Sequence, residues 1–295
     1  MRDGGRRPVG PVAPGPYETF YKSPEVADLI ATWGGEHPDQ VASSYFQVHV
    51  GRFTYLTELV RRLKLTGRCL DVGGTTRSLL LLTERTPLKV ELGPECDLEI
   101  DDWADQAGLD TFDVVVFSEV IEHFNADPSH CLHQINRVLR DSGWLILTTV
   151  NVGSELGVYN LLKGEAPYAM SNLYGKRGDR HQREYAPKEL QRLVAAHGFE
   201  TWVTTVNVYG AADVHQQAHR WLHGGGAELD PRLHGDTNVV LARKVRASEG
   251  PRWLHPIYHS TVSENQRGHL PADVAELLRD GAPEDLAGFH GWPSR

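Results

Sequence analysis

The chain has 295 residues, of which 40% are hydrophobic and 23% charged, and its formal net charge is −9. These values are typical of a globular protein with a sizeable core. The acidic balance disfavours nucleic acid as a partner, because nucleic-acid binding calls for a basic surface. No apolar run reaches the roughly 20 residues of a membrane-spanning helix, so a membrane partner is not expected either. Three cysteines, widely spaced and odd in number, predict a reducing cytoplasm rather than a disulfide framework.

The N-terminal quarter is predicted to be a leader followed by helices. Residues 1–16 are rich in Gly, Pro and Arg and lack the apolar core of a signal peptide, so we expect a disordered leader. Residues 17–66 are predicted to form a helical cap. Its first helix starts at Ser23-Pro24, where a capping serine precedes proline, and stops at Gly34-Gly35. Its second helix covers about 39–64.

This second helical segment carries two polar side chains that could share a face. His49 and Arg52 are three residues apart, which is a neighbouring position on a helix. One interpretation is a solvated face. The other is a lid helix on which Arg52 offers its planar guanidinium to a ligand carboxylate. Gly51 is a candidate break within the segment.

Residues 69–78 read as a buried strand that turns tightly into a helix. The strand ends in Asp71, and Gly73-Gly74 lets the backbone bend or lets a ligand come close. After the first parallel strand of an α/β sheet, such a turn binds a nucleotide-like ligand. An ordinary strand–loop–helix connection is the alternative, because Thr75 and Arg77 stand where a full G-x-G-x-x-G would have more glycines.

Two further acidic strand ends follow. A short strand at 88–91 ends in Glu91, which could accept both hydroxyls of a ribose or be a plain surface acid. Residues 96–100 are predicted as a third strand that leads to Asp101-Asp102-Trp103. There, a carboxylate beside an aromatic ring could bind and stack on an adenine. The alternative is two solvated acids before a helix.

The clearest strand covers 112–118 and is almost entirely apolar and β-branched, as a strand buried on both faces should be. The polar residues Ser118, Glu119, Glu122 and His123 gather at its carboxyl end, which is the ligand side of such sheets. A helix at 129–140 and a strand at 144–150 continue the alternation. The pattern predicts a parallel sheet covered by helices on both faces.

Residues 152–184 break this pattern, and an insert of that length is typically a functional lid or a disordered loop. A helix from about 186 and strands at 201–208 and 237–243 complete the core. The connection between these strands carries three histidines at four-residue spacing, His215, His219 and His223. On one helix they would face the same way and could bind a metal. No carboxylate partner is evident in the sequence, so no metal site is expected.

Together these segments resemble the class I S-adenosylmethionine-dependent methyltransferases over about residues 66–245. The resemblance rests on the glycine turn, the acids after the second and third strands, and four stretches of sequence. These are Phe112–His123 (FDVVVFSEVIEH), Leu139–Leu147 (LRDSGWLIL), Tyr185–Leu190 (YAPKEL) and Ala196–Phe199 (AHGF). The stretch from His181 to Leu190 is most similar to the branch that acts on sugars and natural products.

The resemblance implies an α/β, Rossmann-like, seven-stranded sheet, mostly parallel, with its last strand antiparallel. The core would cover 67–245 with a lid at 152–184, and 246–295 would be an extension that caps the core or contacts a partner. S-adenosylmethionine would be the cofactor and a small molecule the substrate, with a homodimer as a candidate assembly. The residues expected to bind the cofactor are Asp71, Gly73 and Gly74 at its methionine end, Glu91 at the ribose, Asp101, Asp102 and Trp103 at the adenine, Ser118 and Glu119 along its floor, and Arg52 at its carboxylate.

For catalysis, a hydroxyl acceptor needs a base, and histidine suits neutral pH. His181 in the insert is the first candidate and His123 the second, although each could simply be structural. The remaining residues assigned to the substrate are Tyr168, Tyr174, Arg183, Glu184 and Tyr185. Side chains at Thr75 and Arg77 would crowd a cofactor tail unless the turn takes another path. Two alternatives therefore stay open, namely a non-methylating enzyme such as a cyclase and a non-catalytic partner subunit.

Overall fold

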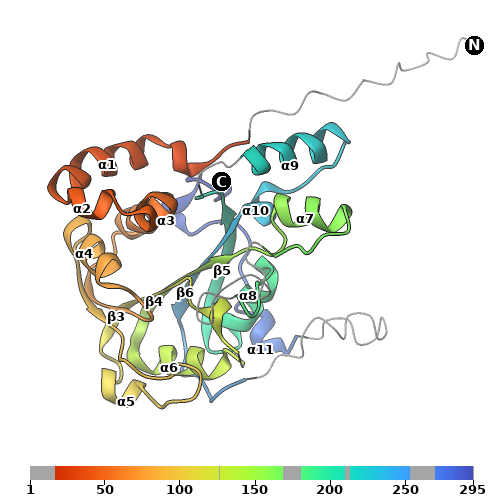
Figure 1. Ribbon diagram of the computed structural model, residues 1–295. Helices are drawn as coiled ribbons and strands as arrows, with labels where there is room; N and C mark the ends of the chain where they lie inside the picture. The colour runs from red at the N-terminus through yellow and green to blue at the C-terminus, as the bar shows by residue number, and fades with distance from the viewer. Residues whose placement is uncertain (1–16, 126, 169–180, 210–212, 253–269, 295) are drawn as a thin grey trace, which may run out of the picture.

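The computed structural model describes residues 17–125, 127–168, 181–209, 213–252 and 270–294, and these form a sheet between two layers of helices (Figure 1). The expected leader and Tyr174 lie outside the described residues. The sheet has six strands in the order β2-β1-β3-β4-β6-β5. The strands are β1 Gly67–Asp71, β2 Leu88–Leu92, β3 Phe112–Ser118, β4 Leu139–Val150, β5 Phe199–Val206 and β6 Thr237–Lys244.

The order and the directions of the strands confirm the prediction of a Rossmann-like sheet. β2, β1, β3 and β4 are parallel, whereas β6 runs antiparallel to both β4 and β5. The last strand of the chain is therefore the antiparallel one, as expected. The carboxyl ends of the parallel strands meet at one edge, which we call the carboxyl edge.

The predicted third strand is wrong, because residues 96–100 form bends and turns instead. The Asp97 carboxylate accepts the backbone N–H of Glu99, and the Asp101 carboxylate accepts that of Asp97. Aspartate side chains that bond to nearby backbone in this way compete with a strand ladder. The described sheet accordingly has six strands and not seven.

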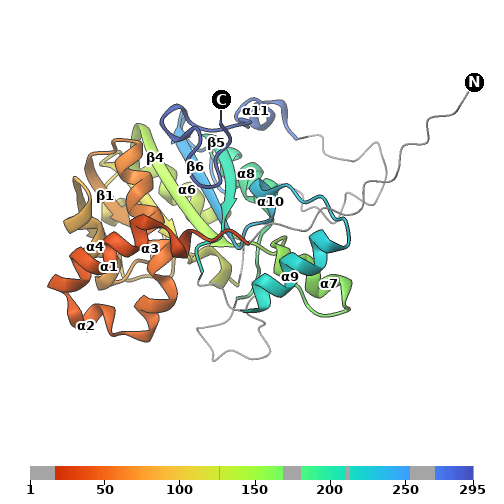
Figure 2. The ribbon, with the colours of Figure 1, turned by 90° about the horizontal axis from the view of Figure 1, so that it is seen from above.

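The helices divide between the two faces of the sheet (Figure 2). Residues of α1, α3 and α4 pack with Phe289 and Trp292 of the C-terminal tail against one face, while α6 and α8 cover the other. Along β3, Val114 and Val116 belong to the first core, and Val115 and Phe117 to the second, as expected for a strand buried on both faces. The helices are α1 Pro24–Glu36, α2 Pro38–Val41, α3 Ser44–Arg62, α4 Thr76–Arg85, α5 Ala104–Ala107, α6 Ser129–Val138, α7 Glu155–Leu162, α8 Pro187–Ala195, α9 Asp213–Gly224, α10 Pro231–His234 and α11 Ala272–Ala275.

The first N-terminal helix begins as predicted but ends later, and the second, predicted over about 39–64, is divided into α2 and α3. Ser23 caps α1 by accepting the N–H of Val26. Gly34-Gly35 does not stop this helix, which continues to Glu36, next to the His37-Pro38 step. A residue before proline is disfavoured in the helical conformation, so the helix ends before His37 instead of at the glycines. None of the helices in the described ranges has the length and apolar character needed to cross a bilayer.

Gly51 does not break α3, and it has a packing role instead. A Cβ at this position would lie 2.0 Å from the backbone oxygen of Val208, just after β5. Only glycine lets the helix come so close to that segment. The close approach places the next residue, Arg52, beside the carboxyl edge.

Candidate active site

The turn after β1 is built around a buried carboxyl group. Asp71 is 2% exposed, and its Oδ2 accepts a hydrogen bond from the Ser78 hydroxyl at 2.6 Å. Gly73 has a φ of +72°, and a Cβ there would lie 2.6 Å from Val120. A Cβ on Gly74 would lie 2.0 Å from the Asp71 carboxylate. Burial raises the pKa of Asp71 to about 6.

The two residues that depart from the glycine pattern have their own local roles. Thr75 has an extended φ of −113°, and its hydroxyl caps α4 by accepting the N–H of Ser78 at 3.2 Å. Arg77 donates from Nε to Gln40 at 2.7 Å, and its guanidinium lies 5.4 Å from the ring centre of Tyr45. Because these side chains are engaged by α4, α2 and α3, the expected crowding of a cofactor tail is not supported.

Arg52 reaches the carboxyl edge from α3. It is 5% exposed and donates from Nη1 to Ser118 at 3.3 Å and from Nη2 to the Tyr45 hydroxyl at 3.2 Å. Its Nε is buried and has no hydrogen-bond partner among the described residues. Burial opposes the charge, but the Glu119 carboxylate keeps the pKa of Arg52 above its ordinary value.

Glu119 connects three parts of the chain in this region. It has a φ of +57°, an uncommon value for a residue other than glycine that often accompanies functional sites. Its carboxylate accepts hydrogen bonds from Thr148 of β4 at 3.0 Å and from Tyr209, after β5, at 2.8 Å. Ser118 and Thr148 share a further hydroxyl contact at 2.7 Å. The sequence offered no signal for Tyr45 and Tyr209, which meet this network only through the fold.

The two histidines predicted from sequence come together at the same edge. His123 lies just after β3 and His181 just after residues 169–180, yet their ring centres are 5.1 Å apart at an angle of 79°. His181 Nδ1 lies 2.8 Å from an oxygen of Glu184, and both side chains are almost completely buried. Backbone bonding contributes to this arrangement, because the N–H of Gln182 donates to the carbonyl of Glu122 at 2.7 Å.

Glu122 is the member of this group that sequence reasoning missed, although it directly precedes His123. It is 1% exposed, and one oxygen accepts a hydrogen bond from Thr149 at 2.7 Å. Burial, reinforced by the charge of Glu119, raises the pKa of Glu122 well above its ordinary value. A carboxyl with a raised pKa beside histidines is typical of sites that move protons.

The residues assigned to the ribose and the adenine each contact a different part of the chain and do not form a cluster like that of His123 and His181. Glu91 forms an ion pair with Arg68 at 2.9 Å, and Asp102 accepts a hydrogen bond from Gln134 at 3.0 Å. The Asp101 carboxylate is used in the turn described above. Trp103 is 0% exposed and belongs to the core with Phe112 and Phe117, so its ring has no exposed face on which an adenine could stack. That assignment of Trp103 is corrected to a core role.

The residues assigned to the substrate differ in their exposure to solvent. Tyr185 is 2% exposed and packs in the core beneath α8, and its substrate role also stays a prediction. Arg183 forms an ion pair with Glu189 and lies 5.1 Å from the Tyr185 ring centre. Tyr168 is 48% exposed. The substrate roles of Tyr168, Arg183 and Glu184 stay predictions.

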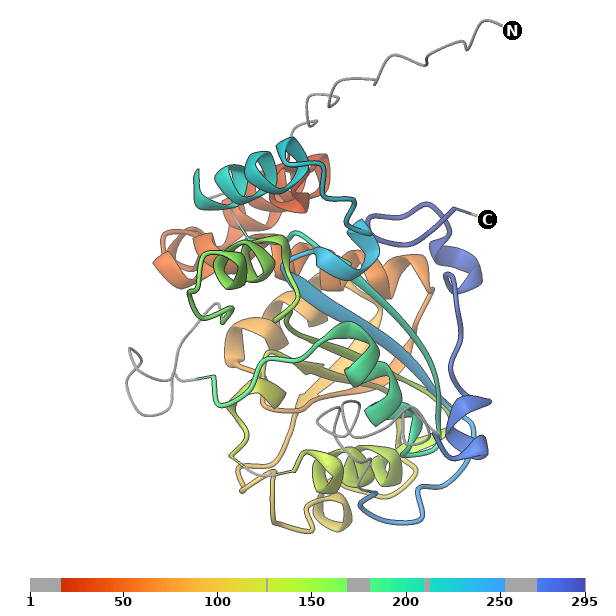
Figure 3. The same cartoon turned by 90° about the vertical axis from the view of Figure 1, so that its right-hand side faces the viewer.

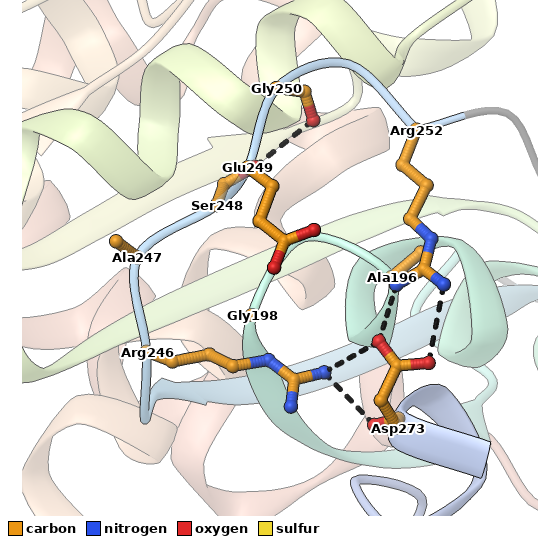
Figure 4. Close-up of a pocket in the computed structure, with 9 residues that line it drawn as sticks. All are labelled: Ala196, Gly198, Arg246, Ala247, Ser248, Glu249, Gly250, Arg252 and Asp273. Atoms are coloured by element: carbon orange, nitrogen blue, oxygen red, sulfur yellow. Dashed lines mark hydrogen bonds and ion pairs between the residues drawn. The ribbon is translucent and has the colours of Figure 1, made fainter. Parts of the chain in front are cut away.

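A separate polar hollow lies at the opposite edge of the sheet, where β6 ends and β5 begins (Figure 4). Arg246 and Arg252 both point to Asp273, at 3.1 Å and 2.5 Å. Asp273 is therefore paired with two arginines of the chain, and the hollow is remote from the strand ends that carry Asp71 and Ser118.

A family model described as a methyltransferase domain matches residues 49–204. This span exceeds half of the chain, and the protein therefore belongs to this methyltransferase family. No curated protein matches the chain. Family membership supports S-adenosylmethionine as the cofactor.

Solved structures with a similar fold are distant in sequence. A S-adenosylmethionine-dependent methyltransferase from Archaeoglobus fulgidus is 17% identical with a TM-score of 0.45, covering 68% of this chain and 100% of that one. Phosphoethanolamine N-methyltransferase 2 from Haemonchus contortus, solved with S-adenosylmethionine, is 14% identical with a TM-score of 0.45, covering 78% and 61%. The [4+2]-cyclase SpnF is 17% identical with a TM-score of 0.37, covering 78% and 98%.

The residues at the turn fit the methionine end of this cofactor. Asp71 offers a carboxylate to an ammonium group, and Arg52 has a buried donor without a partner that a carboxylate could accept. Gly73 and Gly74 let Val120 and the Asp71 carboxylate lie against the turn, because a Cβ on either glycine would meet these side chains.

Proposed function

We propose that this chain transfers a methyl group from S-adenosylmethionine to a hydroxyl or amine of a small metabolite, of the natural-product or sugar class. The observation that carries the proposal is the meeting of His123 and His181 at the carboxyl edge, with His181 backed by a buried carboxylate. The glycine turn and Arg52 lie at the same edge of the sheet.

When bound, the cofactor supplies an activated methyl group on a sulfonium centre. The part played by the chain is to position the acceptor and remove its proton. Glu184 accepts the hydrogen on Nδ1 of His181, which leaves Nε2 as the nitrogen that takes a proton from a hydroxyl. Glu184 also stabilises the imidazolium that results. The low exposure of both side chains keeps water from competing.

Holding the two ends of the amino-acid moiety is the second task. Asp71 would bind the ammonium group and Arg52 the carboxylate, and each would add charge-assisted hydrogen bonds to those it already makes within the chain. Ser118 accepts a hydrogen bond from Arg52, and the negative charge of Glu119 attracts the Arg52 guanidinium. Both would keep the guanidinium in place. Positioning of this kind supplies much of the rate enhancement in a displacement reaction.

A non-methylating enzyme such as a cyclase, or a non-catalytic subunit, are the competing proposals. Both are motivated by Thr75 and Arg77, and the cyclase also by the large histidine-bearing insert. The local roles of these two side chains, as a helix cap and as a partner of Gln40, weaken that motive.

Two measurements test the proposal. Isothermal titration calorimetry of the purified chain should show binding of S-adenosylmethionine. Incubation with methyl-labelled cofactor and a metabolite extract of the host should then yield a labelled product that is heavier by one methyl group. A product of unchanged composition would favour the cyclase. Absence of cofactor binding would overturn the proposal, and activity that appears only with a second protein would favour the subunit.

A further inference from the structure

A group of three metal-ligating side chains lies outside the candidate active site, between α7 and α9. Glu155 begins α7, and His219 and His223 are one turn apart on α9. One oxygen of Glu155 is 2.9 Å from His219 Nδ1, and the other is 2.9 Å from His223 Nε2. The two histidine rings have centres 4.4 Å apart. Figure 3 shows α9 beside α7 on one side of the molecule.

The spacing of these atoms fits a metal ion without large movement. One ligating atom from each residue can be chosen so that all three lie within 4.8 Å of one another. Ligands at roughly 2.1 Å from a tetrahedral zinc ion are about 3.4 Å apart. The present contacts of 2.9 Å between Glu155 and the two histidines would therefore have to lengthen by only about 0.5 Å. Two histidines and one carboxylate are a donor set that suits zinc and its neighbours in the first transition row.

The surroundings hold both helices in position. Tyr159 of α7 packs with Ala218 and Leu222 of α9 in a small apolar cluster beside the ligands. The three side chains are 14% to 24% exposed, so they are sheltered but can be reached from solvent.

His215, at the same four-residue spacing, is not part of the group. Its ring stacks on Tyr17 at 5.7 Å. No carboxylate partner for these histidines is evident in the sequence. The structure supplies one in Glu155 of α7, which lies 64 positions before His219 and 68 before His223.

We propose that Glu155, His219 and His223 bind one divalent transition-metal ion of the zinc class. The ion joins α7, which follows β4, to α9, which follows Tyr209. Thr148 of β4 and Tyr209 are the two side chains that donate to Glu119. The ion therefore fastens together the two segments that support Glu119 at the carboxyl edge. This site does not depend on the proposed methyl transfer.

Equilibrium dialysis of tag-free, chelator-stripped protein against Zn²⁺, with elemental analysis of the bound metal, tests the proposal. We expect one ion per chain. Glu155→Gln keeps the size of the side chain but removes its charge and replaces one accepting oxygen by an NH2 donor, and His223→Ala removes a ligand. Each should weaken binding at least tenfold, since even residues that only orient a ligand contribute about 10–100-fold.

Two controls locate the binding. His215→Ala removes a histidine from the same helix outside the group, and His181→Ala disrupts the second group of possible ligands, Glu122, His123 and His181. Both should bind Zn²⁺ as the unmodified chain does. Zn²⁺ should also raise the melting temperature of the unmodified chain by several degrees, and that of Glu155→Gln much less. Absence of a bound ion, or binding that Glu155→Gln and His223→Ala leave unchanged while both remain folded by circular dichroism, would overturn the proposal. So would a stoichiometric ion that is lost in His181→Ala alone.

Discussion

The replacement Asp71→Asn should make the cofactor-free protein more stable and bind S-adenosylmethionine less well. Burial holds the Asp71 pKa at about 6, against an ordinary value of 3.8. At about 1.4 kcal/mol per pH unit, this difference means that the ionised carboxylate costs the fold about 3 kcal/mol. Asparagine removes that cost, and its side-chain oxygen can still accept the hydrogen bond from Ser78.

The sign of the pH dependence follows from the raised pKa. Stability associated with Asp71 is fully present below pH 3.8, falls as the pH rises toward 6, and stays low above it. The advantage of Asp71→Asn should therefore grow by about 1.4 kcal/mol between pH 5 and pH 8, with the full ~3 kcal/mol reached only above pH 6. Urea denaturation of the cofactor-free proteins at several pH values measures this difference.

The affinity for S-adenosylmethionine should fall in Asp71→Asn, whereas the stability of the fold should rise. Loss of a charged hydrogen-bond partner costs about 1.5–3 kcal/mol, so the Kd for S-adenosylmethionine should rise roughly 10–150-fold at pH 8. Asp105→Asn is the matched control, because Asp105 forms a surface ion pair with Arg137. It should leave cofactor affinity unchanged and shift stability by no more than about 0.5 kcal/mol. A destabilised Asp71→Asn whose stability difference is independent of pH, or one with unchanged affinity, would refute the reasoning.

The remaining predictions concern the base and the helical cap. Glu184→Gln should lower kcat roughly 10–150-fold, because the charged hydrogen bond that steadies an imidazolium is worth about 1.5–3 kcal/mol, while cofactor affinity stays constant. Glu84→Gln, which alters another close histidine–glutamate pair on the surface, should leave kcat unchanged, and equal effects of the two variants would contradict the role of His181. Gly51→Ala should lower the free energy of unfolding, measured by urea denaturation, by about 1–3 kcal/mol, since the alanine Cβ would overlap the Val208 carbonyl. Gly35→Ala meets open space in a helix and should stabilise by about 0.5–1 kcal/mol, so similar effects at both glycines would argue against the packing role of Gly51.

Sequence reasoning predicted the strands and helices of the core because those signals are local. The run at 112–118 is nearly all apolar and forms β3 as expected. The error at 96–100 has the opposite cause. There, the hydrogen bonds made by Asp97 and Asp101 outweigh a weak strand pattern of only five residues.

Site residues were harder to predict, because motif order does not determine which way a side chain faces. Trp103 follows two exposed acids, yet its ring is turned completely into the core. Tyr185 lies one residue from Glu184 but packs under α8. His123 was chosen for its place after a strand and His181 for its place in the insert. Their contact across 58 positions depends on how residues 181–185 bond to the turn after β3.

Gly51 and Arg52 show how a local signal and a tertiary requirement can point in opposite directions. Glycine weakens a helix by roughly 1 kcal/mol, so helix propensity alone favours a break at Gly51. The structure instead uses the missing side chain to bring α3 against the carbonyl of Val208. The next residue along the helix then reaches Ser118, and Tyr209, one residue after Val208, holds the Glu119 carboxylate. Any side chain at position 51 would push α3 and the Val208–Tyr209 segment apart, and Arg52 and Glu119 would be displaced together.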